Sequence, residues 1–218
     1  TEHFFVAFEQ DLDYWAHEVI KAAEEVWDEL IAAYDLRDEY QKVYIYIIDP
    51  GDFSGGYTYP TKNRVTIYTT QLELNIRSTD SWVRNVVTHE LAHIFSIKAA
   101  NKDFLFDNFT LGSFSRYRNP DWSGSVHYAN LLAPTWWIEG VAQYEAWKNG
   151  SDRWDTHRDM FLRMATLEND LLGHREMSDF DSRHGFYPEM VYNQGFSLMM
   201  FLDSAFGEQR VRDIARKK

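Results

Sequence analysis

Cysteine is absent from the chain, and its absence excludes two kinds of protein. Disulfide frameworks need paired cysteines, and many zinc sites are built on cysteine thiolates. Any metal bound here must therefore be held by histidine, aspartate or glutamate. A chain without cysteine is compatible with the cytosol and with a bacterial envelope alike.

Basic residues and long apolar runs are also scarce. Lysine and arginine number 22 against 34 aspartates and glutamates, which gives a formal net charge of −12. Phosphate binding needs clustered basic side chains, and the only such cluster, Arg216 to Lys218, lies at the chain end. The charge therefore argues against nucleic acid as a partner. No apolar run approaches the roughly 18 residues that span a bilayer, so no membrane span is expected.

The chain does contain enough apolar material for a core. Of its 218 residues, 44% are hydrophobic and 17% aromatic, which is typical of a folded domain rather than a disordered segment. We expect one domain over residues 1–218, sheet-rich over 1–75 and helical with the metal site over 76–218. The last helix reaches Arg216 to Lys218 without a capping residue, so we expect this domain to be a fragment of a longer protein.

Hydrophobic periodicity predicts strands and one helix in the first part of the chain, followed by helices only. The expected strands are His3–Phe8, Val43–Ile48, Tyr57–Tyr59 and Arg64–Thr70. The expected helices are Asp11–Tyr34, Trp82–Ala99, Thr135–Trp147, Asp155–Leu172 and Met190–Ala205. Residues 101–133 lack periodicity, which predicts a long loop or a partly helical insertion. Because the strands are too close for βαβ crossovers throughout, we predict an α+β fold with a small sheet packed on helices.

The strongest chemical signal is His89-Glu90-Leu91-Ala92-His93 inside an expected helix. Residues four apart lie one turn above each other on one helix face, so both imidazoles can reach one zinc ion at about 2.0–2.1 Å. Glu90 is displaced by one residue and is placed to accept a proton from a water at the metal. The alternative is two histidines satisfied by neighbours, but the apolar surroundings make unpaired polar groups costly. We predict His89 and His93 as ligands and Glu90 as the catalytic base.

Two imidazoles need a third protein ligand, and a catalytic zinc keeps a further position open. Glu139 is the best candidate, because it is the one carboxylate in the first half of the otherwise apolar helix Thr135–Trp147 and a buried unpaired glutamate is rarely tolerated. Glu145 follows nearly two turns later and is rotated away, which assigns it to the surroundings of the site or to solvent. The other histidines are expected to be ordinary surface or core residues.

Together, H-E-L-A-H and the later W-I-E-G-V-A-Q-Y-E resemble the motif pair of the gluzincin zinc metallopeptidases. The resemblance is to the peptidase MA-like group, related to the aminopeptidase N and leukotriene hydrolase type, in which two histidines and a glutamate bind zinc. The residues that match its W-x-x-E-G-x-A-x-Y pattern are Trp136, Glu139, Gly140, Ala142 and Tyr144.

This resemblance covers residues 60–207 and has several implications. It implies a zincin-like fold with an edge strand packed on the H-E-x-x-H helix, a Zn²⁺ cofactor, and a peptide or protein substrate. By the same analogy, the chain would belong to a larger envelope protein. An extracytoplasmic location, in a bacterial periplasm or secreted, is therefore expected over a cytoplasmic one.

A third segment, Tyr192-Asn193-Gln194-Gly195-Phe196, resembles the Y-x-x-G-F segment of the same enzymes. Their tyrosine donates a hydrogen bond to the oxyanion of the tetrahedral intermediate, so the resemblance implies that role for Tyr192. The plain alternative is an amphipathic tyrosine at a helix start. Tyr187 is a weaker candidate for the same role.

Two departures separate the chain from the aminopeptidase branch. The interval from His93 to Glu139 is much longer, and the G-x-M-E-N segment that holds a substrate's free amine is missing, so aminopeptidase activity is not expected. By analogy, Arg64–Thr70 takes the place of the edge strand on which an extended peptide pairs; an ordinary sheet strand is the equal alternative. The aromatics of residues 101–133 are expected to hold a long loop down rather than to line a subsite.

The sequence thus predicts a zinc metallopeptidase, and the same parts could hydrolyse other amides or epoxides. The alternative is a catalytically silent, peptidase-like binding module within a larger envelope protein, which keeps the fold but not turnover. The intact Glu90 favours the enzyme. A purely structural zinc site fits poorly, because two histidines and one glutamate leave a position open.

Overall fold

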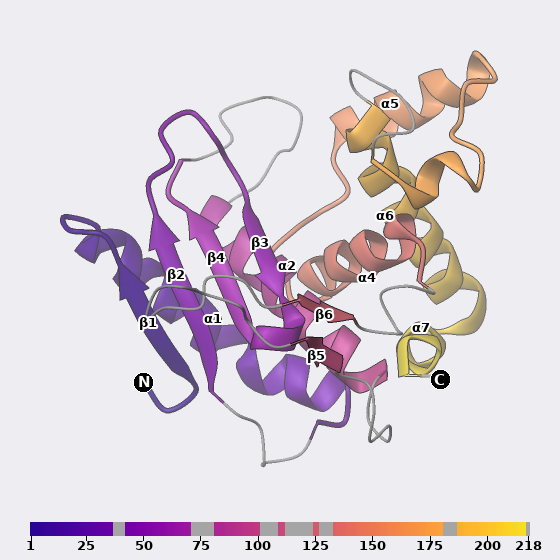
Figure 1. Ribbon diagram of the computed structural model, residues 1–218. Helices are drawn as coiled ribbons and strands as arrows, with labels where there is room; N and C mark the ends of the chain where they lie inside the picture. The colour runs from indigo at the N-terminus through magenta and orange to yellow at the C-terminus, as the bar shows by residue number, and fades with distance from the viewer. Residues whose placement is uncertain are drawn as a thin grey trace.

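A four-stranded sheet and six α-helices form an α+β fold in the part of the chain that the structure describes (Figure 1). The computed structural model describes residues 1–36, 42–70, 81–100, 109–111, 124–126, 133–180 and 187–216. The strands of the sheet are β1 (Phe4–Phe8), β2 (Val43–Ile48), β3 (Gly56–Tyr59) and β4 (Arg64–Tyr68). The helices are α1 (Asp13–Ala33), α2 (Trp82–Ala100), α4 (Thr135–Lys148), α5 (Thr156–Leu167), α6 (Tyr187–Phe206) and α7 (Glu208–Arg216).

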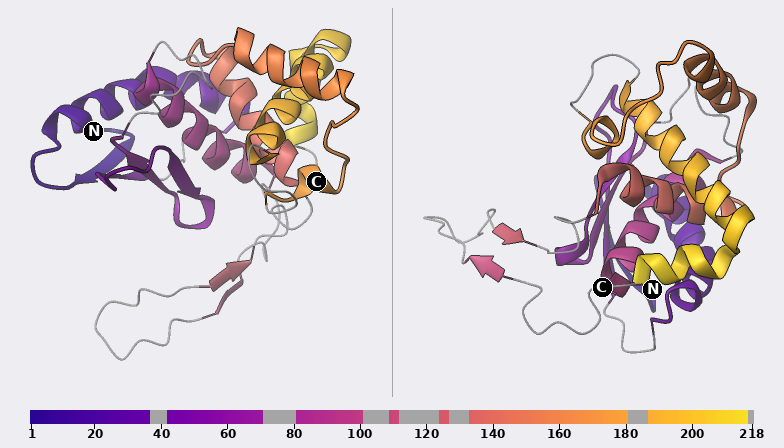
Figure 2. Two further views of the ribbon diagram at one scale, coloured as in Figure 1. Left: turned by 90° about the horizontal axis from the view of Figure 1, so that it is seen from above. Right: turned by 90° about the vertical axis from the view of Figure 1, so that its right-hand side faces the viewer.

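The two faces of the sheet differ because apolar side chains alternate along its strands. In β2, Val43, Ile45 and Ile47 are buried, whereas Tyr44 and Tyr46 are exposed, as the period of two in a strand requires. The buried face is covered by α1 and α2, which lie on one side of the sheet (Figure 2).

Aromatic contacts join the sheet to both helices of this core. The Trp27 ring of α1 lies 5.1 Å from the Phe4 ring of β1 and 5.3 Å from the Phe95 ring of α2, both edge to face. Burying a large apolar side chain stabilises the fold by about 1.5–3 kcal/mol, so this cluster holds the sheet firmly against α2.

The strand order is β1-β2-β4-β3. The placement of Arg64–Thr70 at the sheet edge, which rested on analogy, is therefore wrong. β1, β2 and β4 run parallel, and β3 pairs antiparallel with β4. A 3₁₀ turn at Pro60–Lys62 and the left-handed Asn63, with φ of 51°, reverse the chain between β3 and β4. Since β4 also pairs with β2, both of its sides are used, and β3 becomes the edge strand.

Two glycines set the separation of α4 and α6. A Cβ atom added at Gly140 would lie 2.7 Å from the carbonyl carbon of Gly195, and one added at Gly195 would collide with the carbonyl oxygen of Trp136. Only glycine lets two helix backbones approach this closely. The crossing places Glu139, at one glycine, and Tyr192, a turn before the other, on the same side of the helix pair.

Glu145 is fully buried and makes no part of its surface available to solvent. Its carboxylate accepts hydrogen bonds from Arg212 of α7 at 3.0 and 3.1 Å and from the hydroxyl of Tyr34, after α1, at 3.1 Å. Of the two placements expected for Glu145, solvent is therefore wrong. The side chain instead ties α4 to the first and last helices described.

The helix expected over Asp155–Leu172 is shorter in the structure. Asp155 caps its start by accepting hydrogen bonds from the backbone N–H groups of His157 and Arg158. The helix ends at Leu167 because Asn169 takes a left-handed conformation with φ of 55°, which is a common way to terminate a helix.

Most of the insertion at 101–133 lies outside the described residues. Within it, β5 (Phe109–Leu111) and β6 (Gly124–Val126) form a short antiparallel pair. The expectations for its aromatic side chains stay predictions. Among the helices described, none combines the length and the apolar character needed to cross a membrane.

The close approach of α4 and α6 predicts that Gly195→Ala destabilises the protein. Alanine is favoured over glycine within a helix by about 1 kcal/mol, but the added methyl group must push the helix backbones apart, and such overpacking costs about 1–3 kcal/mol or more. We expect a lower free energy of unfolding in urea. Gly173→Ala is the matched control, because its Cβ would meet only the Glu176 side chain at 3.4 Å. Equal or greater stability of Gly195→Ala would contradict this packing.

Candidate metal centre

Helix α2 brings His89 and His93 together in the middle of the molecule. The sheet covers one side of this helix and α4 the other, so both histidines are buried, with 8% of each residue exposed. One turn separates them, and their Nε2 atoms lie 3.1 Å apart. The structure thus brings the two imidazoles close enough to share one ligand.

Glu139 of α4 completes the group. Its Oε2 lies 3.1 Å from Nε2 of His89 and 3.3 Å from Nε2 of His93. In the part of the chain that the structure describes, this is the one cluster of three such side chains that could hold a metal ion. Glu139 was predicted on sequence grounds, and the structure brings it to the histidines.

The spacing of these three atoms fits a metal ion. Donors held at about 2.0–2.1 Å around a tetrahedral ion are separated by about 3.3–3.4 Å, and the three observed separations are close to that value. Two imidazole nitrogens and one carboxylate oxygen suit zinc and other divalent transition metals. Among the described residues, no fourth side chain joins these three, which leaves room for a further ligand, as a catalytic site requires.

The protonation of the cluster follows from its mutual contacts. Burial alone would lower the pKa of His93, but the neighbouring carboxylates of Glu139 and Glu90 outweigh it and raise that pKa above its ordinary value of 6.5. Burial alone would raise the pKa of Glu139, but the imidazoles of His93 and His89 hold it well below its usual range. Without a metal, the raised pKa of His93 favours a proton on this imidazole beside the Glu139 carboxylate.

Glu90 lines the same cavity as the three candidate ligands and contacts the edge strand β3. Its carboxylate Oε2 accepts a hydrogen bond of 2.6 Å from the hydroxyl of Thr58, and only 5% of the residue is exposed. A Cβ atom at Gly56 would lie 3.1 Å from Cγ of Glu90, so this glycine leaves room for the carboxylate. Sequence reasoning missed Thr58 and Gly56, although the alternation of β3 puts both on the face that meets α2.

Tyr192 of α6 also lies beside the cluster. Its ring centroid is 6.2 Å from that of His89, and the ring stacks on Phe180 at 5.2 Å. Tyr187 instead donates a hydrogen bond of 2.7 Å to Asp170. Of the two tyrosines considered for the oxyanion role, Tyr192 is thus the one next to the histidines.

All five predicted site residues line one cavity of about 300 Å³. The edge strand and its following turn form one wall, and α2, α4 and α6 form the others. The residues that line the cavity are Gly56, Tyr57, Thr58, Pro60, His89, Glu90, His93, Ile97, Ile138, Glu139 and Tyr192. An open space therefore exists next to the metal ligands, in which a substrate could bind.

In comparisons with known proteins, no family model and no curated protein sequence matches this chain.

The geometry predicts that His93→Ala and Glu139→Ala each weaken binding of a divalent transition metal. Each change removes one of three converging donors, so affinity should fall by more than the roughly 10–100-fold cost of losing an outer-shell partner. Isothermal titration of metal-free protein with zinc measures this. His17→Ala is the control, because His17 lies on the exposed side of α1. Unchanged affinity in both ligand variants would show that the metal binds elsewhere.

Metal affinity should also fall on acidification. A metal must displace the proton of His93, whose raised pKa keeps it protonated to a higher pH than an ordinary histidine. Below that pKa, the apparent dissociation constant should rise about tenfold for each pH unit if one proton is displaced. Zinc titrations between about pH 8 and pH 6 measure the slope. An affinity independent of pH over this range would be inconsistent with histidine ligands.

Proposed function

We propose that the protein is a zinc-dependent metallopeptidase of zincin-like fold. The observation that carries the proposal is the meeting of His89, His93 and Glu139 at 3.1–3.3 Å in a cavity that Glu90 also lines. Three ligands with an open position, next to a carboxylate that is not itself a ligand, are the parts that metal-assisted hydrolysis requires.

Zn²⁺ bound by these side chains would supply the Lewis acid that polarises a scissile carbonyl and activates water. Glu90 is the general base. It accepts the proton that the attacking water loses and then passes it to the nitrogen of the leaving amine, so that its carboxylate is regenerated. The hydrogen bond from Thr58 fixes the orientation of this carboxylate, which matters because small displacements of a catalytic group reduce the rate strongly.

Tyr192 stabilises, in this proposal, the charge that develops on the carbonyl oxygen. Its ring lies beside His89 and lines the cavity, and its phenol is a neutral hydrogen-bond donor. Donors of this kind act most strongly in a site from which water is largely excluded. Its stacking on Phe180 holds the ring in place.

The edge strand β3 supports a polypeptide as the substrate. Among the described strands, only β4 pairs with β3, so its other side can accept the backbone of an extended peptide. Thr58 and Tyr57 of this strand line the cavity. A peptide paired with β3 would therefore pass directly in front of Glu90 and the metal ligands.

The proposal predicts that Glu90→Gln keeps the metal but loses hydrolysis. Loss of a general base lowers kcat by about 10²–10⁴-fold, whereas the amide leaves all three ligands in place. Elemental analysis of the purified wild type should find about one zinc per chain, and cleavage of an unstructured protein substrate is followed by mass spectrometry. Glu168→Gln, at an exposed position, is the control.

The outcomes separate the two functions. Zinc in the wild type with cleavage that Glu90→Gln abolishes would establish the peptidase. Zinc without cleavage of any substrate in a peptide library would leave a catalytically silent binding module.

Tyr192→Phe tests the oxyanion role. Removing one such donor should lower kcat by about 10²–10³-fold with little change in KM, because the hydrogen bond forms only as the charge develops. Tyr187→Phe is the matched control, since it removes a phenol that donates to Asp170 rather than the one beside His89. Equal effects of the two changes would reject a specific role for Tyr192.

A further inference from the structure

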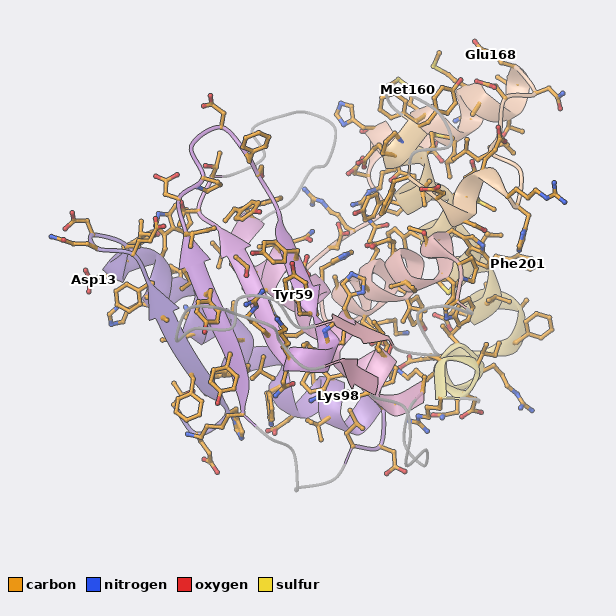
Figure 3. The ribbon with its side chains drawn as sticks, in the orientation of Figure 1. Asp13, Tyr59, Lys98, Met160, Glu168 and Phe201 are labelled. Carbon is orange, nitrogen blue, oxygen red and sulfur yellow. The ribbon has the colours of Figure 1, made fainter. Side chains whose placement is uncertain are left out.

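The outer face of the sheet is the strongest feature that the metal centre does not use. α1 and α2 cover the opposite face, and Figure 3 looks onto the outer face, with Tyr59 in front of the strands. The strand register aligns Phe5, Tyr44, Arg64 and Tyr59 in one row across the sheet. We call this surface the aromatic face; its aromatic members are Phe5, Tyr44, Tyr46, Tyr57, Tyr59 and Tyr68.

These aromatic side chains are unusually exposed. The exposed fractions of Phe5, Tyr44, Tyr46 and Tyr59 are 51%, 44%, 41% and 43%. A contiguous exposed aromatic patch on a folded domain commonly marks a binding surface. Tyrosine and arginine are also the residue types enriched where proteins bind one another most strongly.

The charge of the aromatic face is opposite to that of the whole chain. None of the four strands contains an aspartate or glutamate, although the chain has a net charge of −12. The Arg64 guanidinium lies 4.4 Å from the Tyr59 ring centroid, and the Lys42 and Lys62 ammonium groups lie 4.9 and 5.8 Å from the Phe5 and Tyr59 rings. Within the described residues, no carboxylate pairs with Lys62 or Arg64, so both cations are available to a partner.

The ring contacts indicate which groups the surface offers. Phe5 and Tyr44 stack on each other at 5.2 Å, and Arg64 also lies 5.6 Å from the Tyr46 ring. Ring faces are thus taken up by neighbours, which disfavours a sugar that would need to stack on them. The hydroxyls of Tyr44, Tyr46 and Tyr59 make no hydrogen bond within the described part of the chain. Together with the cations, they are donors suited to carboxylate and carbonyl oxygens.

We propose that the aromatic face is a docking surface for an acidic segment of a polypeptide substrate. It is continuous with the cavity, because Tyr57 belongs to the face and also lines the cavity beside Thr58. One polypeptide can therefore reach both the metal centre and this surface. The acidic chain as a whole disfavours nucleic acid, and a symmetric pair of copies would place like cations against each other.

The assignment of the partner as a substrate rests on the proposed peptidase function. Binding and hydrolysis are therefore measured separately. The probe for binding is a fluorescein-labelled peptide of alternating Glu and Ser, compared with Asn-Ser and Lys-Ser peptides of equal length. Fluorescence anisotropy is measured with zinc-loaded Glu90→Gln, so that no cleavage disturbs the titration.

The acidic peptide should bind at least about tenfold more tightly than the Asn-Ser peptide. Lys62→Glu and the double variant Lys62→Glu/Arg64→Glu should lose this preference, because they reverse the charge of the face. Lys62 is exposed, so the single variant should fold even if the double variant does not. Lys21→Glu is the matched control: it makes the same charge change on the exposed side of α1 and should bind like the parent.

Several results would overturn the proposal. Equal affinity for the acidic and Asn-Ser peptides would do so, as would an equal loss in Lys21→Glu, which would indicate a general charge effect. A change in molecular mass by light scattering on Lys62→Glu would assign the face to contacts between copies. If an anionic polysaccharide displaces the labelled peptide at a lower carboxylate concentration than the unlabelled acidic peptide does, the aromatic face would be assigned to a glycan.

A comparison with hydrolysis separates the two proposals. Acid-selective binding without hydrolysis by the wild type would reject the peptidase and leave a docking surface for acidic polypeptides. Hydrolysis without acid-selective binding would reject the docking surface and leave the peptidase. If both hold, an acidic extension on a cleaved substrate should lower KM about tenfold with kcat unchanged, and Lys62→Glu should remove that gain.

Discussion

The contact between Gly140 and Gly195 determines how closely α4 and α6 can cross, and the metal centre depends on that separation. Glu139 precedes the first glycine, and Tyr192 lies one turn before the second. If either helix carried a side chain at the crossing, the backbones would have to move apart. Glu139 or Tyr192 would then move away from the histidines of α2. Because metal ligation tolerates errors of only a few tenths of an ångström, this helix packing would determine how well the three side chains can bind a metal.

A second constraint is electrostatic. Three groups with lone pairs, two imidazoles and one carboxylate, meet in a buried space. Such a group is stable only if a cation neutralises it. A proton held with His93 does this in the absence of metal, and a metal ion does it through all three donors at once. In the same buried setting, the carboxylate of Glu90 accepts a hydrogen bond from Thr58 of the edge strand.

The sequence predicted those strands, helices and site residues that a local residue pattern specifies. Val43–Ile48 was predicted with the bounds that β2 has, because a run of β-branched and aromatic residues ends at Asp49-Pro50. The two histidines and Glu139 were found because helical spacing and the isolation of a carboxylate among apolar residues are visible without a structure. Zinc itself, the peptidase activity and the gluzincin resemblance stay predictions.

Other features depend on tertiary contacts that no local sequence pattern indicates. The expectation from the sequence assigned the wrong strand to the sheet edge, because which strands pair depends on tertiary contacts. The end of α5 depends on a left-handed Asn169 within an otherwise helical composition. The partners of Glu145 lie 67 and 111 residues away, so no pattern within α4 indicates that it is fully buried. Thr58 is recognisable as a contact of Glu90 only once the strand lies on α2.

The pairing of Glu145 with Arg212 has a consequence for the order in which the protein assembles during synthesis. Glu145 and Glu139 lie on one helix, so the position of the third candidate ligand is stabilised by α7, which is synthesised after α2 and α4. A ribosome releases the H-E-x-x-H helix long before that helix emerges. For that interval the two histidines lack a firmly positioned Glu139, so tight binding of a metal by all three side chains would follow rather than guide the docking of α7.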